Sequence, residues 1–390
     1  MSQKRFGWVR TIRKGKGLLF ITLFDGKEVF QATLPAELKP VSLTVGASVF
    51  CTGTDGRTPT DQYEFVVEAI EVLGGSDETY PIQPKKHTMD FLRTIPELRG
   101  KTRTFQEIWK LRHHAASAML RFLNEEGFTQ YWTPILTQAD CEGAGATFTV
   151  GTDLDDNIAE LSVSGQLYAE VGAMSLGKVY TFSPCFRAEE SHTKKHLQEF
   201  WMLEPEMVLH DLGQTMDLAE SLVKTVLRDL LTRPGAALDR LAEAIHSDWV
   251  RVKYQDVIGA FGIQHGHDIS SDKEKEIVAH YGAPVFITHY PKDLKPFYMA
   301  TEGEYALCFD LIFPEVGELI GGSVREPDYK TLVRRMEHAD IDPARMEWYL
   351  ATRKYGSVPH AGFGLGFERL LMFVCDAQKI HDVIPFPVSA

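Results

Sequence analysis

Residues 186–206 read FRAEESHTKKHLQEFWMLEPE, two strand-like runs on either side of a loop rich in Lys, His, Ser and Thr. If both runs lie in one sheet, Arg187 and Glu189 share a face, and the returning strand brings Glu199 and Phe200 opposite them. An Arg fixed on a sheet can hold a phosphate through two parallel hydrogen bonds, and an aromatic ring can stack on a base. A solvated hairpin with Arg–Glu surface pairs explains the same residues equally well.

The strands around this hairpin are long and few, and they do not alternate with helices as a parallel sheet requires. Helices are predicted over 212–231 and 236–246. Further strands are predicted at LSVSGQLY (161–168), KVYTFSPCFRAE (178–189), APVFIT (283–288), YALCFDLIF (305–313) and ELIGGSVRE (318–326). This pattern predicts an α+β domain built on an antiparallel sheet flanked by helices.

The first 76 residues have a different pattern. Short alternating strands separated by Gly or Asp turns predict a small β-barrel. Residues 1–35 carry seven basic residues against two acidic ones, which points weakly to nucleic acid at this end. Residues 77–103 have the composition of a linker or hinge, and a helix with Thr104 as its N-cap opens a second domain over 104–390.

A second candidate cluster is DLIFPEVGELIGGSVRE at 310–326, with carboxylates at Asp310, Glu315 and Glu318. Mg²⁺ is usually bound by one or two carboxylates together with substrate phosphates. The Gly321–Gly322 pair favours function over an ordinary acidic loop, because missing side chains let a ligand approach the backbone.

A third cluster is HAGFGLGFERLL at 360–371, in which Gly362, Gly364 and Gly366 alternate along a predicted strand. Alternate glycines clear one face of a strand, so a flat group such as a purine can lie on it, with Arg369 reaching its phosphates. Close packing of a helix on the strand is the alternative. The spacing does not fit the dinucleotide fingerprint GxGxxG.

Composition narrows the function classes. The chain has 390 residues, a net charge of −13 and five widely separated cysteines with no CxxC. The charge argues against indiscriminate coating of nucleic acid, and the cysteines against a disulfide framework or a zinc knuckle. With no apolar signal segment and no membrane-length apolar run, the sequence predicts a soluble, cytoplasmic protein. It contains no GxSxG, HExxH or P-loop.

Taken in order after a small barrel, the three clusters resemble those of class II aminoacyl-tRNA synthetases, specifically the asparaginyl-tRNA synthetase branch. GWVRTIRKGKGLLFITLFDG (7–26) resembles the anticodon-binding OB domain, and EEGFTQYWTPILT (125–137) resembles motif 1. Motif 2 is similar to FRAEESHTKKHLQEFW and motif 3 to GFGLGFERLL. VSGQLY (163–168), IGGSVRE (320–326) and HDVIPFP (381–387) are also typical of this branch.

The resemblance implies ATP- and Mg²⁺-dependent activation of asparagine, transfer to tRNA, and a homodimer formed through motif 1. It implies that Arg187 holds the α-phosphate, Arg369 the γ-phosphate, and that Phe200 stacks on adenine. The resemblance further implies that the ATP pocket includes Glu189, His196, Glu199, Gly364 and Gly366, and that Glu318 binds the metal. It implies an amino-acid pocket formed by Glu142, Ser164, Gln166, Glu170 and Arg325, and an anticodon contact through Phe20 and Gln31.

Aspartyl-tRNA synthetases are close relatives of this branch, and they carry a Lys at the position of Ala169 that pairs with the aspartate side chain. A buried carboxylate without a cation is strongly disfavoured. We therefore expect Glu170 or a neighbour to accept a hydrogen bond from the asparagine carboxamide and to repel aspartate.

Two other functions fit the same residues. One is a synthetase paralogue that passes its adenylate to a non-tRNA acceptor, although the retained OB domain argues against it. The other is a non-catalytic tRNA- or protein-binding regulator, which would have no need of Arg187, Glu318 and Arg369 together.

Overall fold

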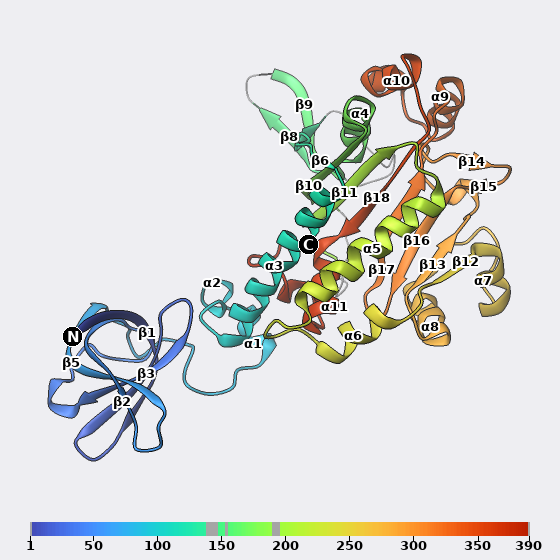
Figure 1. Ribbon diagram of the computed structural model, residues 1–390. Helices are drawn as coiled ribbons and strands as arrows, with labels where there is room; N and C mark the ends of the chain where they lie inside the picture. The colour runs from blue at the N-terminus through green and yellow to red at the C-terminus, as the bar shows by residue number, and fades with distance from the viewer. Residues whose placement is uncertain (1, 138–146, 153–154, 189–195, 389–390) are drawn as a thin grey trace. The chain divides into compact units, whose positions relative to one another are not determined.

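The computed structural model describes residues 2–137, 147–152, 155–188 and 196–388. The chain divides into two compact units, residues 1–102 and 103–390. Figure 1 shows the elements of both units. None of the described helices is both long and apolar enough to cross a membrane.

The N-terminal unit contains a closed five-stranded barrel in the order β1-β2-β3-β5-β4, in which only β3 and β5 pair in parallel. Side chains alternate between the interior and the surface, so that Leu19, Ile21 and Leu23 of one strand enter the barrel core. The strands are β1 (Gln3–Lys14), β2 (Leu18–Phe24), β3 (Val29–Pro35), β4 (Ser48–Arg57) and β5 (Tyr63–Gly74). A short 3₁₀ helix, η1 (Ala36–Leu38), follows β3.

The segment predicted as a linker contains two short helices, α1 (Met89–Arg93) and α2 (Pro96–Arg99). Thr88 caps the first through its side chain, which accepts the Phe91 N–H, and Pro96 occupies the first position of the second. The predicted boundaries at residues 76 and 103 stay predictions.

The C-terminal unit is built on an eight-stranded sheet in the order β12-β13-β16-β17-β18-β11-β10-β6. Its pairs are antiparallel except at the two edges, where β12–β13 and β10–β6 are parallel. The strands are β6 (Thr129–Gln130), β10 (Lys178–Phe186), β11 (Glu199–Val208), β12 (Val250–Lys253), β13 (Val285–Thr288), β16 (Cys308–Phe313), β17 (Gly317–Val324) and β18 (His360–Gly366). Two small sheets contain β7 (Leu136–Thr137), β8 (Thr149–Thr152) and β9 (Asp155–Leu161), and β14 (Thr301–Glu302) and β15 (Tyr305–Ala306).

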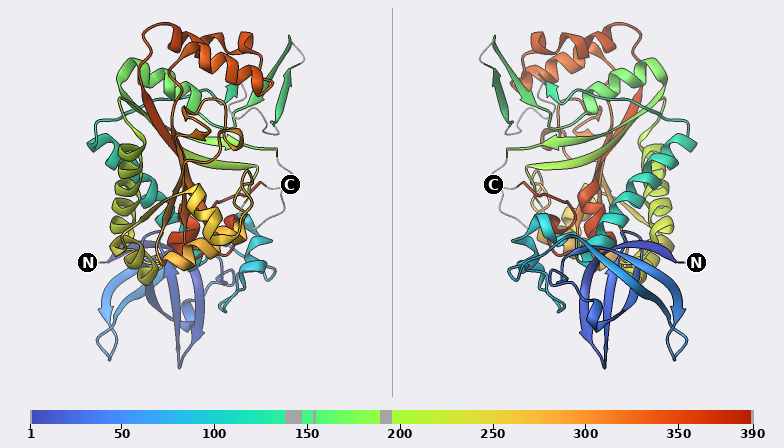
Figure 2. Two further views of the ribbon diagram at one scale, coloured as in Figure 1. Left: turned by 90° about the vertical axis from the view of Figure 1, so that its right-hand side faces the viewer. Right: turned by 90° about the vertical axis from the view of Figure 1, so that its left-hand side faces the viewer.

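Helices pack along the large sheet, and Figures 1 and 2 show α3 and α5 running beside it. The α-helices are α3 (Arg103–Glu125), α4 (Gln166–Leu176), α5 (Leu212–Leu230), α6 (Leu238–His246), α7 (Tyr254–Phe261), α8 (Ser271–Tyr281), α9 (Tyr329–His338), α10 (Glu347–Lys354) and α11 (Phe367–Cys375). Short 3₁₀ helices are η2 (Lys292–Leu294), η3 (Pro343–Met346) and η4 (Ile380–Asp382). Asp211 caps α5 in a reciprocal capping box with Gln214.

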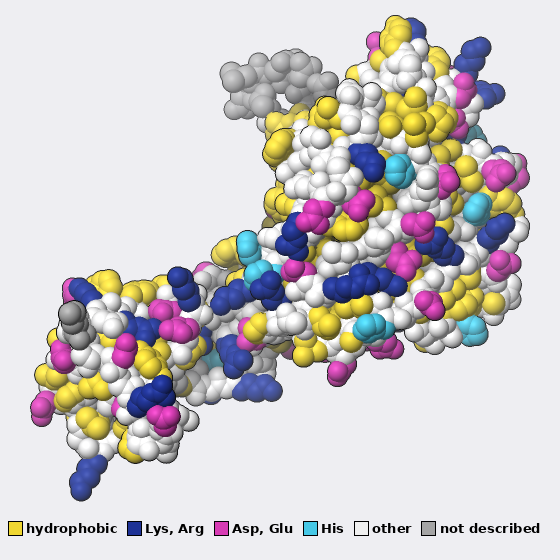
Figure 3. All heavy atoms as spheres, in the orientation of Figure 1, with side chains coloured by type: hydrophobic (Ala, Val, Ile, Leu, Met, Phe, Trp, Pro, Cys, Tyr) yellow, Lys and Arg dark blue, Asp and Glu magenta, His cyan; other side chains and the backbone are white. Residues whose placement is uncertain are grey.

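The exposed face of α5 carries charges of both signs. Arg251 pairs with Asp217, and Lys224 pairs with Glu220 on the same helix. Figure 3 shows acidic and basic side chains interspersed over this face, with no large area of one sign. This face therefore has none of the concentrated positive charge that attracts a phosphate backbone.

The structure confirms the predicted α+β architecture of a small barrel followed by an antiparallel sheet with helices. Two details are wrong. Thr104 was expected to cap the first long helix, but α3 begins at Arg103, so Thr104 lies within the helix. LSVSGQLY was predicted as a strand, but β9 ends at Leu161 and helix α4 begins at Gln166. The helix starts there because the Gly165 N–H is bound by the carboxylate of Glu204 on β11, at 2.9 Å, where a negative charge complements a helix N-terminus.

Candidate active site

A cavity of about 440 Å³ lies over β11, β17 and β18 and contains most of the residues singled out in the sequence. Its floor is set by strand pairing, because Gly321 lies between Asp310 on β16 and Gly364 on β18. Alternation along β11 places Phe200, Met202 and Glu204 on one face, and all three line the cavity. The volume is in the range of small-molecule sites.

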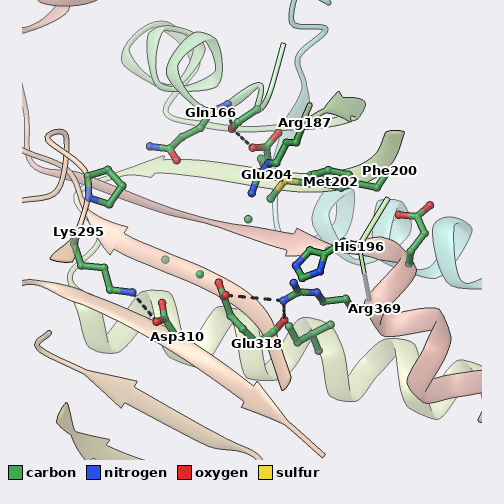
Figure 4. Close-up of a pocket in the computed structure, with 18 of the residues that line it drawn as sticks. Gln166, Arg187, His196, Phe200, Met202, Glu204, Lys295, Asp310, Glu318 and Arg369 are labelled. Carbon is green, nitrogen blue, oxygen red and sulfur yellow. Dashed lines mark hydrogen bonds and ion pairs between the residues drawn. The ribbon is translucent and has the colours of Figure 1, made fainter. Parts of the chain in front are cut away.

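One end of the cavity is positively charged and carries an aromatic ring. Arg187 lies with its guanidinium carbon 5.3 Å from the centre of the Phe200 ring. Arg369 donates to the backbone carbonyl of Glu318, and its Nη1 is 3.9 Å from the Glu318 carboxylate. Figure 4 shows Arg187, His196, Phe200 and Arg369 around this end. Two arginines beside an aromatic ring suit a nucleoside with a charged phosphate chain.

Two carboxylates meet over Gly321. A Cβ atom at that glycine would lie 3.0 Å from Oε1 of Glu318 and 3.8 Å from Oδ1 of Asp310. The absent side chain thus leaves a space bordered by two acidic oxygens, in a pocket that also holds phosphate-binding cations. These donors fit a hard divalent cation such as Mg²⁺.

Asp310 has a cationic partner. Lys295 Nζ lies 2.6 Å from Asp310 Oδ2, and it also lies 3.9 Å from the centre of the Tyr290 ring. Burial lowers the pKa of Lys295, but Asp310, together with Cys308 and Glu318, more than offsets this effect and raises the pKa above its usual range. Burial also raises the pKa of Asp310, while Lys295 opposes the change. Lys295 therefore remains positive and balances a buried carboxylate.

The other end of the cavity is polar and more deeply buried. Ser164 donates to one oxygen of Glu204, and the Gly165 N–H donates to the other. Gln166, the first residue of α4, also lines this end. Because a carboxylate oxygen accepts more than one hydrogen bond, Glu204 can still accept from an ammonium group.

Arg325 is held in place by Glu206 and Ser323. Its Nε and Nη2 lie 3.2 and 2.5 Å from the two oxygens of Glu206, and its Nη1 donates to Ser323. Gly362 makes this possible, because a Cβ there would lie 2.1–2.4 Å from the Glu206 carboxylate. Burial, together with the neighbouring Glu170 and Glu204, raises the pKa of Glu206 to about 8 against the effect of Arg325.

Residues 89–390 match a protein-family model described as tRNA synthetases class II (D, K and N). The chain belongs to this family. A second model, the OB-fold nucleic acid binding domain, matches residues 6–73. The family predicted from the ordered motifs is therefore confirmed.

Named relatives are asparagine–tRNA ligases. The enzyme of Bacteroides fragilis is 40% identical over 434 aligned residues, which cover 98% of this chain and 93% of the relative. The enzyme of Desulfotalea psychrophila is 40% identical over 98% of this chain and 94% of its own length. Among solved structures, asparaginyl-tRNA synthetase of Pyrococcus horikoshii complexed with asparaginyl-adenylate is 30% identical, with a TM-score of 0.92 over 100% of this chain and 95% of that one.

The synthetase structure brings most of the predicted site residues to one pocket. Glu199 begins β11 but is not among the residues that line the cavity. Glu142 and Glu189 lie outside the described residues. The residues that line the cavity as predicted are Ser164, Gln166, Arg187, His196, Phe200, Glu318, Arg325, Gly364, Gly366 and Arg369.

Glu170 lies behind the pocket wall and is fully buried. Its Oε1 is 3.0 Å from Gln166 Nε2 and 3.9 Å from Arg325 Nε, and both partners line the cavity. Ala169 packs with Ala173 and Val179 in a small apolar cluster. A Lys at position 169 would have to displace this cluster before it reached a substrate.

Sequence reasoning missed Glu204 and Lys295 as site residues, and it named Asp310 only as a member of a candidate acidic cluster without assigning it to the metal. Glu204 follows Phe200 at an even spacing on a predicted strand, so period-2 alternation could have found it. Lys295 carries no comparable signal, because it lies in an irregular segment and meets Asp310 only through the fold.

The predicted anticodon residues share the outer face of the barrel. Phe20 and Gln31 are both partly exposed, and Gln31 accepts a hydrogen bond from Arg13 at 3.0 Å. Strand pairing places Arg13 beside Phe20, and Thr22 beside Gln31. An aromatic ring, an amide and a cation on adjacent strands are suited to an unpaired base and its phosphate.

Proposed function

We propose that this chain is an asparagine–tRNA ligase that makes asparaginyl-adenylate from asparagine and ATP and transfers the asparaginyl group to tRNA. The observation that carries the proposal is the division of a single cavity. Arg187, Phe200 and Arg369 form an end suited to ATP, and Gln166 and Arg325 form a polar end suited to an amino acid.

In the first step, a carboxylate oxygen of asparagine attacks the α-phosphorus of ATP, and the bond to pyrophosphate breaks. In the second, a hydroxyl of the terminal tRNA ribose attacks the carbonyl of the mixed anhydride, and AMP leaves. Both steps depend on positioning and charge neutralisation more than on proton transfer. Arg187 neutralises the α-phosphate and Arg369 the γ-phosphate.

The ATP end holds the base as well as the phosphates. Phe200 stacks on adenine, and the glycines at 364 and 366 leave its neighbourhood clear. His196 contributes from the cavity wall, where Figure 4 shows it close to Arg369. Glu189 and Glu199 complete this end in the proposal.

Asp310 and Glu318, whose carboxylates border the space beside Gly321, would hold Mg²⁺. When bound, the ion would neutralise phosphate oxygens of ATP. Lys295, which pairs with Asp310 in this structure, lines the same cavity and would be available to the phosphates. Both carboxylates belong to the acidic cluster singled out in the sequence, and the family resemblance assigned only Glu318 to the metal.

At the amino-acid end, Glu204 binds the α-ammonium group together with Ser164 and Gln166. The substrate side chain lies toward Arg325 and Glu170. Burial would raise the pKa of Glu170, but Arg353 and His360, with Arg325, hold it well below its usual range. A fixed negative charge there accepts a hydrogen bond from a carboxamide and repels the carboxylate of aspartate. Glu142 belongs to the same end in the proposal.

We also propose a homodimer formed through motif 1. In this segment Trp132 is 80% exposed, and Ile135 and Leu136 are exposed as well. Such neighbouring apolar side chains on a surface mark a contact with another chain. Light scattering should give twice the chain mass, and a Trp132→Lys substitution should shift it toward the monomer. The cytoplasmic location stays a prediction.

The test is charging of bulk tRNA with labelled asparagine, run in parallel with labelled aspartate and with ATP–pyrophosphate exchange. Asparagine incorporation that requires ATP and is lost in Arg369→Ala supports the ligase. Exchange without charging would favour an adenylate-forming paralogue. A folded protein that binds tRNA but catalyses neither reaction would favour the regulator.

A further inference from the structure

A cluster of buried polar side chains lies behind the amino-acid end of the pocket. It consists of Tyr349 and Arg353 on α10 and His360 at the start of β18, all packed around Glu170 of α4. All four are buried, at most 5% exposed, and none lines the cavity. We call the three residues around Glu170 the carboxylate clamp.

The clamp acts on one oxygen of Glu170. Tyr349 Oη donates to Oε2 at 2.7 Å, Arg353 Nη2 donates to Oε2 at 2.5 Å, and His360 Nε2 lies 3.0 Å from the same atom. The other oxygen, Oε1, faces the Gln166 amide and the Arg325 guanidinium. The carboxylate is therefore anchored on one side, and its second oxygen is directed toward residues that line the pocket.

Arg353 is itself fixed on every edge of its guanidinium. Its Nε donates to the backbone carbonyl of Glu326 at 3.1 Å, and its Nη1 donates to Thr352 Oγ1 at 2.8 Å. Glu326 directly follows Arg325. The Arg353 guanidinium therefore contacts both the backbone next to Arg325 and the carboxylate of Glu170. Arg is suited to this role because its planar fork holds several acceptors in fixed directions.

His360 has a defined tautomer. Its Nδ1 lies 2.9 Å from the Val358 carbonyl oxygen, which can only accept, so Nδ1 carries the proton. Burial lowers the pKa of His360, whereas contact with Glu170 raises it. In the protonated ring, Nε2 donates to Glu170 Oε2 at 3.0 Å, and in the neutral ring the same nitrogen accepts from Arg353 Nη2 at 3.1 Å. Within the clamp, Arg353 supplies the positive charge, and Tyr349 supplies a neutral donor.

We propose that Tyr349, Arg353 and His360 are positioning residues that fix the Glu170 carboxylate as a negative charge facing Gln166 and Arg325, and so set the preference for asparagine over aspartate. This inference rests on the proposed ligase function and deepens it. A carboxylate free to turn or to take up a proton would accept the carboxamide less well and repel a second carboxylate less strongly.

A buried ion pair can also serve only to hold α4 against α10. The two roles differ in what they predict for kinetics. A structural role lowers stability and leaves the relative use of two amino acids unchanged. A positioning role changes the KM for asparagine and the asparagine-to-aspartate ratio, while the KM for ATP and the kcat stay close to those of the unchanged protein.

The decisive variant is Tyr349→Phe, which removes one donor and keeps the ring. In asparagine-dependent ATP–pyrophosphate exchange, we expect the KM for asparagine to rise about tenfold and the preference over aspartate to fall about tenfold, as loss of one hydrogen bond to a charged group implies. The matched control is Tyr180→Phe, because Tyr180 is also buried but its hydroxyl donates to Asn124, at 3.2 Å, from β10. This control should leave both quantities unchanged.

Arg353→Lys and His360→Gln test the rest of the clamp, with melting temperatures measured for each variant. Lys keeps the charge but loses the fork, so Arg353→Lys should retain part of the preference that Arg353→Met loses. The proposal is overturned if the variants melt earlier yet keep the asparagine-to-aspartate ratio of the unchanged protein. If the unchanged protein does not activate asparagine at all, the ligase function fails first, and this inference fails with it.

Discussion

Arg112 of α3 lies 2.7 Å from one oxygen of Glu368 at the start of α11, and the other oxygen of Glu368 accepts the Trp201 N–H of β11 at 2.9 Å. Glu368 is next to Arg369, and Trp201 is next to Phe200. A single buried carboxylate thus connects the long first helix of the C-terminal unit to the neighbours of Phe200 and Arg369, two of the residues proposed to hold ATP. Arg112 also donates to the Val383 carbonyl at 3.0 Å.

Arg112→Met should therefore weaken ATP binding more than asparagine binding. Burial raises the pKa of Glu368, and loss of Arg112 would leave its carboxylate without a cation. We expect the KM for ATP in pyrophosphate exchange to rise about tenfold, since truncating one partner of a buried charge pair costs more than 1 kcal/mol. Arg121→Met on the same helix breaks an exposed pair with Asp229 and should change neither KM. Equal effects of the two variants would contradict this linkage.

Gly362→Ala should damage the amino-acid end of the pocket. The new methyl group would lie 2.1–2.4 Å from the Glu206 carboxylate, which must then move and release Arg325. Overpacking of a buried site costs about 1–3 kcal/mol, so we expect kcat/KM for asparagine to fall about 10- to 100-fold. Gly259→Ala, on the exposed side of α7 with no atom within 4 Å of the added methyl, is the control and should be neutral. An unaffected Gly362→Ala protein would mean that Glu206 does not fix Arg325.

Lys295→Met should make the metal site bind divalent cations before ATP arrives. Without Lys295, the carboxylate of Asp310 loses the cation that balances it in this structure. We expect the affinity for Mn²⁺ without ATP, followed by electron paramagnetic resonance, to rise about tenfold, while pyrophosphate exchange slows. Lys292→Met removes a nearby lysine that pairs with exposed Glu304, and it should behave as the unchanged protein. Unaltered Mn²⁺ binding in Lys295→Met would disprove the balancing role.

Sequence patterns located the cavity but not the contacts that support it. Alternation along β11 and the glycines of β18 follow from a two-residue period, and these features correctly predicted which faces line the cavity. The start of α4 could not be predicted in this way, because it depends on Glu204, which is 39 residues away from Gly165. The same holds for Arg325 and Glu206, which are 119 residues apart and meet only across β18, the strand between β17 and β11.

Glu170→Gln should destabilise the protein in a pH-dependent manner. The pKa of Glu170 is depressed in the folded state, so the ionised carboxylate contributes stability above its unfolded pKa, near 4.5, and this contribution is lost as the pH falls below that value. Breaking a buried pair costs about 3–5 kcal/mol, so the melting temperature near pH 7 should fall by several degrees. The difference in melting temperature between the variant and the unchanged protein should become smaller as the pH is lowered to about 4. Glu243→Gln on exposed α6 provides the control, and a gap independent of pH would contradict an ionised Glu170.

Phe20→Ala in the barrel should separate the two half-reactions. If Phe20 stacks on an anticodon base, the substitution loses about 1–3 kcal/mol of tRNA binding, which is about 5- to 150-fold in the KM for tRNA. Asparagine-dependent pyrophosphate exchange needs no tRNA and should be unchanged. Gln31→Ala should act in the same direction, because its amide lies on the same outer face. Val41→Ala, at a fully exposed position of the same unit, is the matched control and should alter neither assay. If both Phe20→Ala and Gln31→Ala have a normal KM for tRNA, the outer face of the barrel does not contact the anticodon as proposed.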